Sequence, residues 1–404
     1  MLAFAPPFDP VTDPAKVLTV LLAIEGGVLY LSKLQQMQWF FKYLPSMFWI
    51  YFLPMVANTL GLLPAASGVY DAVGLYILPA SLVLLLMPVD VRSIVRLGPV
   101  AIVLMLAGSV GTFIGGPIVV LMFKGVLPAD GWQSLGVLSA SWIGGSANMA
   151  AVKELTKMHD GAFTTAVVVD TLVPYAWMGV LILLSGYQAF YDRHNRSRQT
   201  MVDDLAQRAR VGQVQKQPVS LEMLGVMAAV VMGVTMGGIY LSGHLAALQE
   251  RLYHAVIIDA KPMGILLASM VGLTLSFTPL RKLDAHGATH IGNLLLYLLL
   301  ATFGAKANLT NLGGAPWLLV AGAAWIVIHA GFLIFIGRLL RAPMALLATA
   351  SQANIGGPAS APVVAGIYQP SLAPVGLLMA LLGYFIGTYM GWACYWLCGL
   401  AARL

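Results

Sequence analysis

Apolar residues follow one another in long unbroken stretches along almost the whole chain, and short polar segments separate these stretches. Each stretch is about 15 to 26 residues long, which suits a helix that crosses a membrane. The apolar residues are continuous rather than alternating with polar ones, so the pattern favours helices over the strands of a membrane barrel. We therefore predict an all-α polytopic membrane protein. The ten predicted spans lie near residues 15–31, 45–63, 71–88, 98–123, 162–187, 221–243, 263–279, 290–304, 316–337 and 372–399.

Two further apolar stretches, 133–157 and 342–370, differ from the others because each contains a short segment of glycine, small and polar residues. The first segment reads IGGSANMAAV (143–152) and the second reads IGGPASAPVV (355–364). Paired glycines weaken a helix, and prolines interrupt it. Irregular backbone at membrane depth must line a cavity or be buried in protein. We predict that each stretch is a re-entrant hairpin, and the alternative is an unwound helix that crosses the membrane.

Basic residues in the polar segments indicate how the chain is oriented. The longest polar segment, 188–219, carries the largest group of Lys and Arg residues, so we expect it to be cytoplasmic. If both motif stretches turn back within the membrane, the other basic loops fall on the same side. Both termini then lie outside. The N-terminal segment has no signal-peptide pattern, and we predict a multi-pass protein of the cell inner (plasma) membrane.

The two motifs reveal an internal repeat. They are 212 residues apart, and the same offset aligns Trp177-Met178-Gly179 with Tyr389-Met390-Gly391. Similar turns, ending at Pro99 and Pro316, precede the corresponding long helices. We predict a first repeat over 1–187, a cytoplasmic loop over 188–219 and a second repeat over 220–404, each repeat having five spans and one motif stretch. Because the halves start on opposite sides they are inverted, an architecture of many secondary transporters.

The motif residues predict a solute site. At a break inside the membrane, free N–H groups at a helix start attract anions and free carbonyl groups at a helix end attract cations. The nearby side chains are small and uncharged, which suits hydrogen bonds to a small polar solute. The alternative for these residues is close helix packing through small side chains. The predicted solute-binding residues are Gly144, Gly145, Ser146, Gln352, Asn354, Gly356, Gly357 and Ser360.

Ionisable residues inside apolar stretches are costly and are functional by default. Asp170 is one, and we predict that it binds Na⁺ or a proton; the alternative is a carboxylate hydrogen-bonded inside the bundle. Glu25 is either a second coupling site or a scaffold residue. His329 is either a proton carrier or a hydrogen-bonded core histidine. The predicted Na⁺ ligands are Ser141, Asn148, Asp170 and Thr171.

Composition narrows the function further. The chain is 59% hydrophobic and 9% charged, far below the charge of a soluble domain. The net charge of +6 belongs to the loops and does not form a motif that reads nucleic acid. The motifs HExxH, GxSxG and Walker A are absent, so we expect neither an enzyme nor a nucleotide-driven pump, and no organic cofactor. Cys394 and Cys398 are expected to be buried thiols.

Three segments carry a family resemblance: the one around GGSAN, the segment SQANIGGPASAP (351–362) and the stretch DVRSIVRLGP (90–99). Together they resemble the integral-membrane family known as domain of unknown function 819, over nearly the whole chain. More distantly, glycine pairs at two hairpin tips in inverted halves are similar to the sodium:glutamate symporters and the 2-hydroxycarboxylate transporters. That similarity implies that the tips help to form the solute and Na⁺ sites, and that homodimers move a transport domain by an elevator-type motion.

Sequence patterns and resemblance together predict a secondary active transporter. It would couple Na⁺ or H⁺ to symport of a small polar solute: an amino acid, a small peptide or an organic acid. The two motif stretches and the helices near 162–187 and 372–399 would form the moving domain, with the other helices as scaffold. Two alternatives stay open. One is a cation/proton antiporter centred on Asp170, and the other is a membrane receptor or assembly factor that does not transport.

Overall fold

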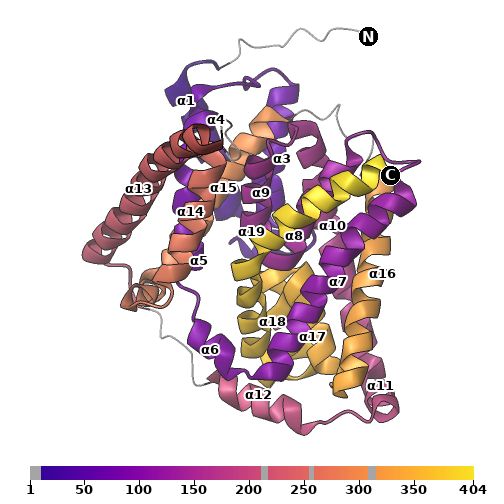
Figure 1. Cartoon of the computed structure of the whole chain (residues 1–404). Helices are drawn as coiled ribbons and strands as arrows, with labels where there is room; N and C mark the ends of the chain where they lie inside the picture. The colour runs from indigo at the N-terminus through magenta and orange to yellow at the C-terminus, as the bar shows by residue number, and fades with distance from the viewer. Residues whose placement is uncertain (1–10, 211–216, 254–258, 308–314) are drawn as a thin grey trace. The chain divides into compact units, whose positions relative to one another are not determined.

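The computed structural model describes residues 11–210, 217–253, 259–307 and 315–404, and within these ranges the regular structure is entirely helical (Figure 1). The prediction of an all-α fold is therefore confirmed for the described part of the chain. Some sequence features fall outside it. These are the N-terminal Asp9, the basic Lys216 and the glycine pair Gly313-Gly314 that precedes Pro316.

The number of candidate spans agrees with the sequence pattern. In the described ranges, eight helical segments are long and apolar enough to cross a membrane. Two bent helix pairs, which break at 81° and 94°, raise the number to ten if each pair is one span. The eight segments are Pro14–Leu31, Gly68–Leu86, Pro99–Phe123, Asp160–Asn195, Leu221–Leu252, Ala288–Lys306, Pro316–Leu340 and Pro370–Arg403. The bent pairs are Gln35–Phe41 with Ser46–Thr59, and Ala260–Leu275 with Pro279–His286.

Local signals in the sequence account for several helix starts. The helix α1 (Pro14–Leu31) begins where the Asp13 carboxylate accepts a hydrogen bond of 3.0 Å from the backbone N–H of Lys16. Proline then occupies the first helical position, where its missing N–H costs nothing. The helix α7 (Pro99–Phe123) also starts with proline, directly after Gly98 at a φ of 87°. Glycine permits this left-handed conformation because it has no Cβ.

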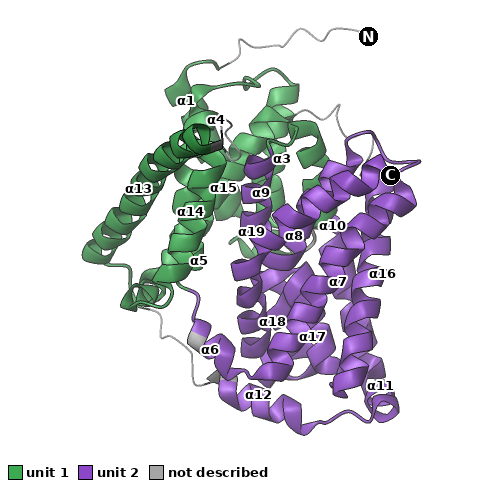
Figure 2. Cartoon of the chain, in the orientation of Figure 1, with its two compact units in different colours: residues 1–88, 157–171, 216–313 green, residues 89–156, 172–215, 314–404 purple. Residues whose placement is uncertain are grey.

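The described chain falls into two compact units, and each unit draws segments from both halves of the sequence (Figure 2). Unit 1 comprises residues 1–88, 157–171 and 216–313. Its apolar core contains Val83, Met227 and Ala268. The helices of unit 1 are α1, α2 (Gln38–Tyr43), α3 (Ser46–Thr59), α4 (Gly68–Ala72), the π-helix η2 (Val73–Ile77), α5 (Leu78–Leu86), α13 (Leu221–Tyr253), α14 (Ala260–Leu275) and α15 (Ala288–Lys306), with the short 3-10 segments η1 (Gln35–Met37) and η4 (Pro279–His286).

Unit 2 comprises residues 89–156, 172–215 and 314–404 and contains both motif stretches. Its core gathers Leu104, Leu205, Leu346 and Val375. The helix α10 (Asp160–Leu184) contributes its first part to unit 1 and its remainder to unit 2. The other helices of unit 2 are α6 (Val91–Arg96), α7, α8 (Gly131–Gly144), α9 (Ser146–Thr156), α11 (Gln188–Asn195), α12 (Thr200–Arg210), α16 (Ala315–Leu340), α17 (Met344–Ile355), α18 (Gly357–Tyr368) and α19 (Ala373–Arg403), with the 3-10 segments η3 (Ser185–Tyr187) and η6 (Pro370–Leu372).

Both motif stretches are interrupted at the glycines that the sequence singled out. The first divides into α8 and α9 at Gly145, which has a φ of 84°. The second divides into α17 and α18, where Gly357 has a φ of 64°. The interruption of each apolar stretch is thus a property of the fold. The re-entrant path and the inverted repeat remain predictions.

The polar segment 188–219 is not irregular, because it contains α11 and α12. One face of α12 is buried in the core of unit 2 through Val202, Leu205 and Ala206. The carboxylate of Asp192, in α11, accepts a hydrogen bond of 2.9 Å from the backbone N–H of Met344, the first residue of α17. An acidic group is favourable at a helix N-terminus. This segment therefore anchors the start of the second motif stretch.

Candidate functional site

The first motif is packed tightly against α19. A Cβ atom added to Gly387 would lie only 2.6 Å from the Cα atom of Gly144, and one added to Gly391 would lie 2.6 Å from the Cα atom of Ala140. A residue with a side chain would clash at these positions, so the glycines allow the backbones of α8 and α19 to come into direct contact. The backbone of Gly144 is therefore packed directly against α19. Gly145 faces the ring of Tyr384, which would lie 3.0 Å from a Cβ atom at that position.

Asn148 joins this contact through its side chain. Its Oδ1 atom accepts a hydrogen bond from the Thr388 hydroxyl, and its Nδ2 group donates to the Gly144 carbonyl oxygen. Only 1% of Asn148 is exposed. In this conformation both ends of the amide are used within the protein. Gly145 and Ser146, the first residue of α9, are the partly exposed residues among those predicted in the first motif, whereas Gly144 is buried.

Asn354 lies in α17, just before the break of the second motif, and its side chain contacts α7. Its Oδ1 atom accepts a hydrogen bond of 2.7 Å from the Ser109 hydroxyl. Its Nδ2 group donates to the carbonyl oxygens of Met105 at 3.1 Å and Ala350 at 3.0 Å. Asn354 is fully buried, and every polar atom of its side chain has a partner. The structure therefore gives this predicted solute ligand a packing role in the described conformation.

A chain of polar side chains runs from α10 through α17 to α16. The Trp177 indole N–H donates to the Ser351 hydroxyl at 2.9 Å, and Ser351 Oγ lies 3.0 Å from His329 Nε2. His329 Nδ1 lies 2.9 Å from the Gly108 carbonyl oxygen. A carbonyl oxygen can only accept, so Nδ1 carries a hydrogen and Ser351 donates to Nε2 of the neutral ring. The fully buried His329 fits the interpretation of a hydrogen-bonded core histidine.

Gln352 differs from these neighbours because half of its amide has no partner. Its Nε2 group donates a hydrogen bond of 2.8 Å to the Ser360 hydroxyl, across the break between α17 and α18. Its Oε1 atom is buried and has no hydrogen-bond partner among the described residues. Exchanging the two amide atoms would leave the nitrogen unpaired instead. A buried polar atom without a partner costs about 1 to 3 kcal/mol, so this atom is expected to serve a ligand.

The two glycines that follow Gln352 differ in the space around them. A Cβ atom added to Gly356 would collide with the side chains of Gln352 and Ser360, so only glycine fits there. A Cβ atom added to Gly357 would meet no atom within 4 Å. The N-terminus of α18 has no side-chain cap, and Pro358 lies in its first turn. A helix start without a side-chain cap, an unpartnered amide oxygen and the open space at Gly357 therefore lie within a few residues of one another at the second break.

The predicted Na⁺ ligands fall into two pairs. Ser141 and Asn148 belong to unit 2, where the backbone N–H of Gly145 donates to the Ser141 carbonyl oxygen at 2.6 Å. Asp170 and Thr171 belong to unit 1, and the Thr171 hydroxyl donates to the Val167 carbonyl oxygen at 2.8 Å. Neither unit by itself assembles the four. Within the described ranges, no group of three His, Cys, Asp or Glu side chains is placed to hold a metal ion.

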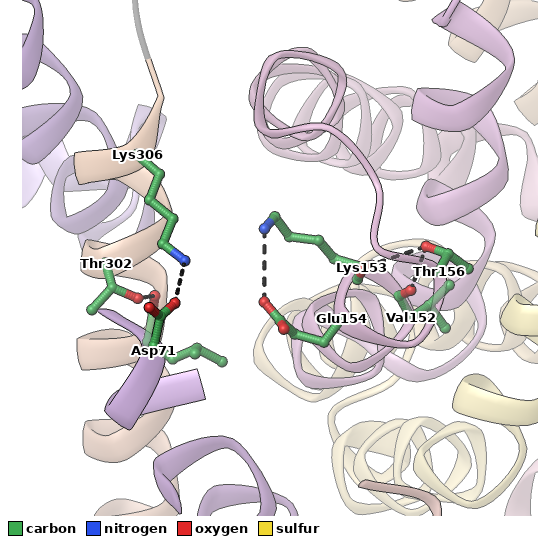
Figure 3. Close-up of polar contacts among 8 residues, drawn as sticks. Asp71, Val152, Lys153, Glu154, Thr156, Thr302 and Lys306 are labelled. Atoms are coloured by element: carbon green, nitrogen blue, oxygen red, sulfur yellow. Dashed lines mark hydrogen bonds and ion pairs between the residues drawn. The ribbon is translucent and has the colours of Figure 1, made fainter. Parts of the chain in front are cut away.

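A charged pair follows the first motif. The Lys153 ammonium lies 3.8 Å from the Glu154 carboxylate, and both side chains are largely buried (Figure 3). The Thr156 hydroxyl, also drawn there, donates to the Val152 carbonyl oxygen at 2.7 Å. The pair lies near the end of α9, two and three residues before its last residue, Thr156.

Sequence reasoning missed the surfaces that receive the two motifs. On α19 the receiving surface is Gly383, Gly387 and Gly391, and the regular spacing of four residues is a signal that could have found it. On α7 it is Gly108 and Ser109, which lie against Asn354. Their role has no local signal, because many membrane helices contain glycine and serine.

Comparisons with known proteins agree with this architecture. The profile of the family described as "Protein of unknown function (DUF819)" matches residues 19–398. One relative is the "Uncharacterized membrane protein YjcL" of Bacillus subtilis (strain 168). It is 25% identical over 344 residues, which cover 83% of this chain and 85% of the relative. The apolar helices and the relative's name together support a multi-pass membrane protein. The match of the profile across nearly all of the sequence shows that this chain belongs to the DUF819 family of membrane proteins.

Proposed function

We propose that this protein is a secondary active transporter that moves a small polar solute across the cell inner membrane, coupled to Na⁺ or H⁺. The polytopic helical architecture suits this function. Two broken apolar stretches within one compact unit also suit it, because transporters commonly build their solute sites from discontinuous helices. We propose further that the two motif stretches are re-entrant, that both termini lie outside, and that homodimers work by an elevator-type motion.

One observation carries the proposal: the unpartnered Gln352 amide atom beside the uncapped start of α18. The helix start offers N–H donors and a positive partial charge, which suit a carboxylate or another anionic oxygen. The Gln352 oxygen offers an acceptor, which suits an ammonium, amide or hydroxyl group. A solute with both kinds of group can satisfy both. Amino acids, small peptides and hydroxylated organic acids have this chemistry.

The grouping of helices supports a division of labour. Unit 2 contains both motif stretches, α19 and the later part of α10, as the sequence-based division proposed for the moving domain. It also contains α7 and α16, which that division had placed in the scaffold. The packing explains the difference, because Asn354 is tied to α7 and His329 on α16 is tied to Ser351. We propose that α7 and α16 move with the motifs.

A ligand screen by thermal stability tests the function. The purified protein is heated in detergent with amino acids, dipeptides and organic acids, each with Na⁺, with K⁺ and at several pH values. A ligand at about 100 times its Kd stabilises the folded state by about 2.7 kcal/mol, which is measurable as a raised midpoint. We expect one solute class to stabilise the protein, and more strongly with Na⁺ or at acidic pH. Radiolabelled uptake of that solute into proteoliposomes then tests transport.

Substitution of Asp170 tests the cation part. Asp170→Asn is expected to reduce the Na⁺ response, while Asp204→Asn, an exposed position of α12, serves as the control. An unchanged Na⁺ response in Asp170→Asn would contradict the assignment of that residue. Cation flux driven by a pH gradient without any solute would favour an antiporter. Neither a ligand nor a flux, in vesicles of verified protein content, would favour a non-transporting receptor.

A further inference from the structure

Glu25 is an acidic residue in the membrane-spanning helix α1, and its carboxyl group is isolated. Only 1% of the residue is exposed. Neither carboxyl oxygen has a hydrogen-bond partner among the described residues. The residue lies on the same helix face as Val17, Leu21 and Val28, all of which are buried. The side chain therefore points into the packed interior of unit 1, among apolar groups.

The helices that pack on α1 supply no free cation for this carboxyl group. The helices with the most extensive packing on α1 are α3, α4 and α15. The Tyr297 hydroxyl of α15 interacts electrostatically with Glu25. On α3, the Tyr51 hydroxyl lies 2.8 Å from the Thr164 hydroxyl. On α4, the Tyr70 hydroxyl donates to the Pro64 carbonyl oxygen at 2.9 Å.

Lys306 of α15 and Asp71 of α4 are paired with each other. The Lys306 ammonium lies 3.5 Å from the Asp71 carboxylate, as Figure 3 shows, and 5.9 Å above the ring of Tyr70. His290 is exposed and lies seven residues before Tyr297 in α15, which is about 10 Å along the helix. A carboxylate without a donor or a cation is unfavourable in an apolar interior by several kcal/mol, whereas the neutral acid is much less so.

We propose that Glu25 is a proton-binding site of unit 1, and that it releases and regains this proton during the working cycle. The release and uptake of this proton during the cycle rest on the proposed function, with the proton as a coupling ion. The carboxylate –COO⁻ takes up a proton to become –COOH and returns to –COO⁻ when the proton leaves, so each cycle moves one proton. This site lies in unit 1, and the solute site proposed above lies in unit 2.

The helix surface next to Glu25 is bare enough to permit exchange. Gly26 and Gly27 follow it directly, both are exposed, and a Cβ atom added to either would meet no atom within 4 Å. No side chain on these two residues covers the approach. A change of the Glu25 rotamer can therefore bring the carboxyl group to the surface of α1 without displacing neighbouring side chains on that flank.

Labelling by dicyclohexylcarbodiimide tests the bound proton. This apolar reagent adds to protonated carboxyl groups in the membrane interior and leaves a stable acylurea that mass spectrometry can locate. We expect an adduct on Glu25 in the folded wild-type protein in lipid nanodiscs, with a yield that falls as the pH rises. The exposed Glu250 is expected to stay unmodified. The adduct is expected to be lost in Glu25→Gln.

The same labelling experiment can contradict the proposal that Glu25 binds a proton. If Glu25 is unlabelled at mildly acidic pH when folded, yet labelled at that pH after unfolding in detergent, the acid form is absent from the folded state. A yield that does not change with pH would overturn reversible proton exchange. Both results are independent of transport, so they stand even if no solute is found.

Proteoliposomes test the role of the proton in the cycle. Glu25→Gln imitates the protonated acid, so we expect it to keep solute-dependent thermal stabilisation and to lose uptake driven by a pH gradient. Gln352→Met should show the opposite pattern, with solute binding lost and the Glu25 adduct retained. Uptake by Glu25→Gln that follows the pH gradient as in the wild type would overturn the coupling role. An absence of uptake in the wild type would instead count against the proposed function.

Discussion

Replacing Gln352 with methionine separates a ligand-binding amide from a structural one. Methionine has a similar length and no branching, so the volume of the site is largely kept. The substitution removes the hydrogen bond to Ser360, which contributes about 0.5 to 1.5 kcal/mol. It also removes the buried oxygen without a partner, whose desolvation costs about 1 to 3 kcal/mol. The free energy of unfolding should therefore change by about −0.5 to +2.5 kcal/mol.

Asn354→Leu is the matched comparison, because Asn354 is an amide in the same helix with every polar atom paired. The substitution removes its contacts with Ser109, Met105 and Ala350. Each hydrogen bond in a membrane protein contributes about 0.6 kcal/mol and at most about 1.7 kcal/mol. We therefore expect a loss of about 2 to 4 kcal/mol, since the Ser109 hydroxyl also keeps only its longer hydrogen bond of 3.1 Å to the Met105 carbonyl oxygen. The two substitutions should move stability in opposite directions or, at the least, by clearly different amounts.

The assay is the apparent melting temperature by fluorescence-detected gel filtration, measured with and without the stabilising solute. Gln352→Met should melt close to or above the wild-type temperature and lose at least about tenfold in solute affinity, equal to 1.4 kcal/mol. Asn354→Leu should melt several degrees lower. The reasoning would be refuted if Gln352→Met melts as low as Asn354→Leu and its response to the solute is intact. Gln352 would then be a structural residue.

Two further experiments test the packing of the first motif and its path through the membrane. Gly387→Ala should destabilise unit 2 by about 1 to 3 kcal/mol, because its Cβ atom would lie 2.6 Å from the Cα atom of Gly144. The control is Gly331→Ala, where a Cβ atom meets nothing within 4 Å, and it should be neutral or stabilising by up to about 1 kcal/mol. Equal melting temperatures of the two variants would contradict the close approach of α8 and α19. The path is tested with single cysteines at two exposed positions that flank the first motif stretch, Ala129→Cys and His159→Cys. A membrane-impermeant maleimide should label both from the same side if the stretch is re-entrant, and from opposite sides if it crosses. The native Cys394 and Cys398 are buried and give little background.

The candidate site shows why sequence reasoning stopped where it did. The glycine pairs correctly indicated where the two apolar stretches break, because a left-handed φ is a local property that glycine permits. Whether a polar residue near the break is free depends on partners far away in the chain. Ser109, which pairs with Asn354, lies 245 residues earlier. No local pattern distinguishes Asn354 from Gln352, two residues before it.

The same limit applies to the ionisable residues. The sequence marked Glu25 and His329 alike, since both interrupt apolar stretches. In the folded chain, His329 has hydrogen-bond partners on both ring nitrogens, whereas neither Glu25 oxygen has one among the described residues. From the sequence, both residues therefore had the same two interpretations, and the contacts in the folded chain distinguish between them.

The sequence by itself determined that this is a helical membrane protein, where most of its spans lie and where two further apolar stretches break. These properties follow from the transfer of apolar side chains into lipid and from backbone geometry, which depend on neighbouring residues. Tertiary structure decided which glycines serve helix contact, which amides are paired and which carboxyl group is isolated. Those properties arise from contacts between segments hundreds of residues apart, such as Gly144 with Gly387. Only the folded chain brings such segments together.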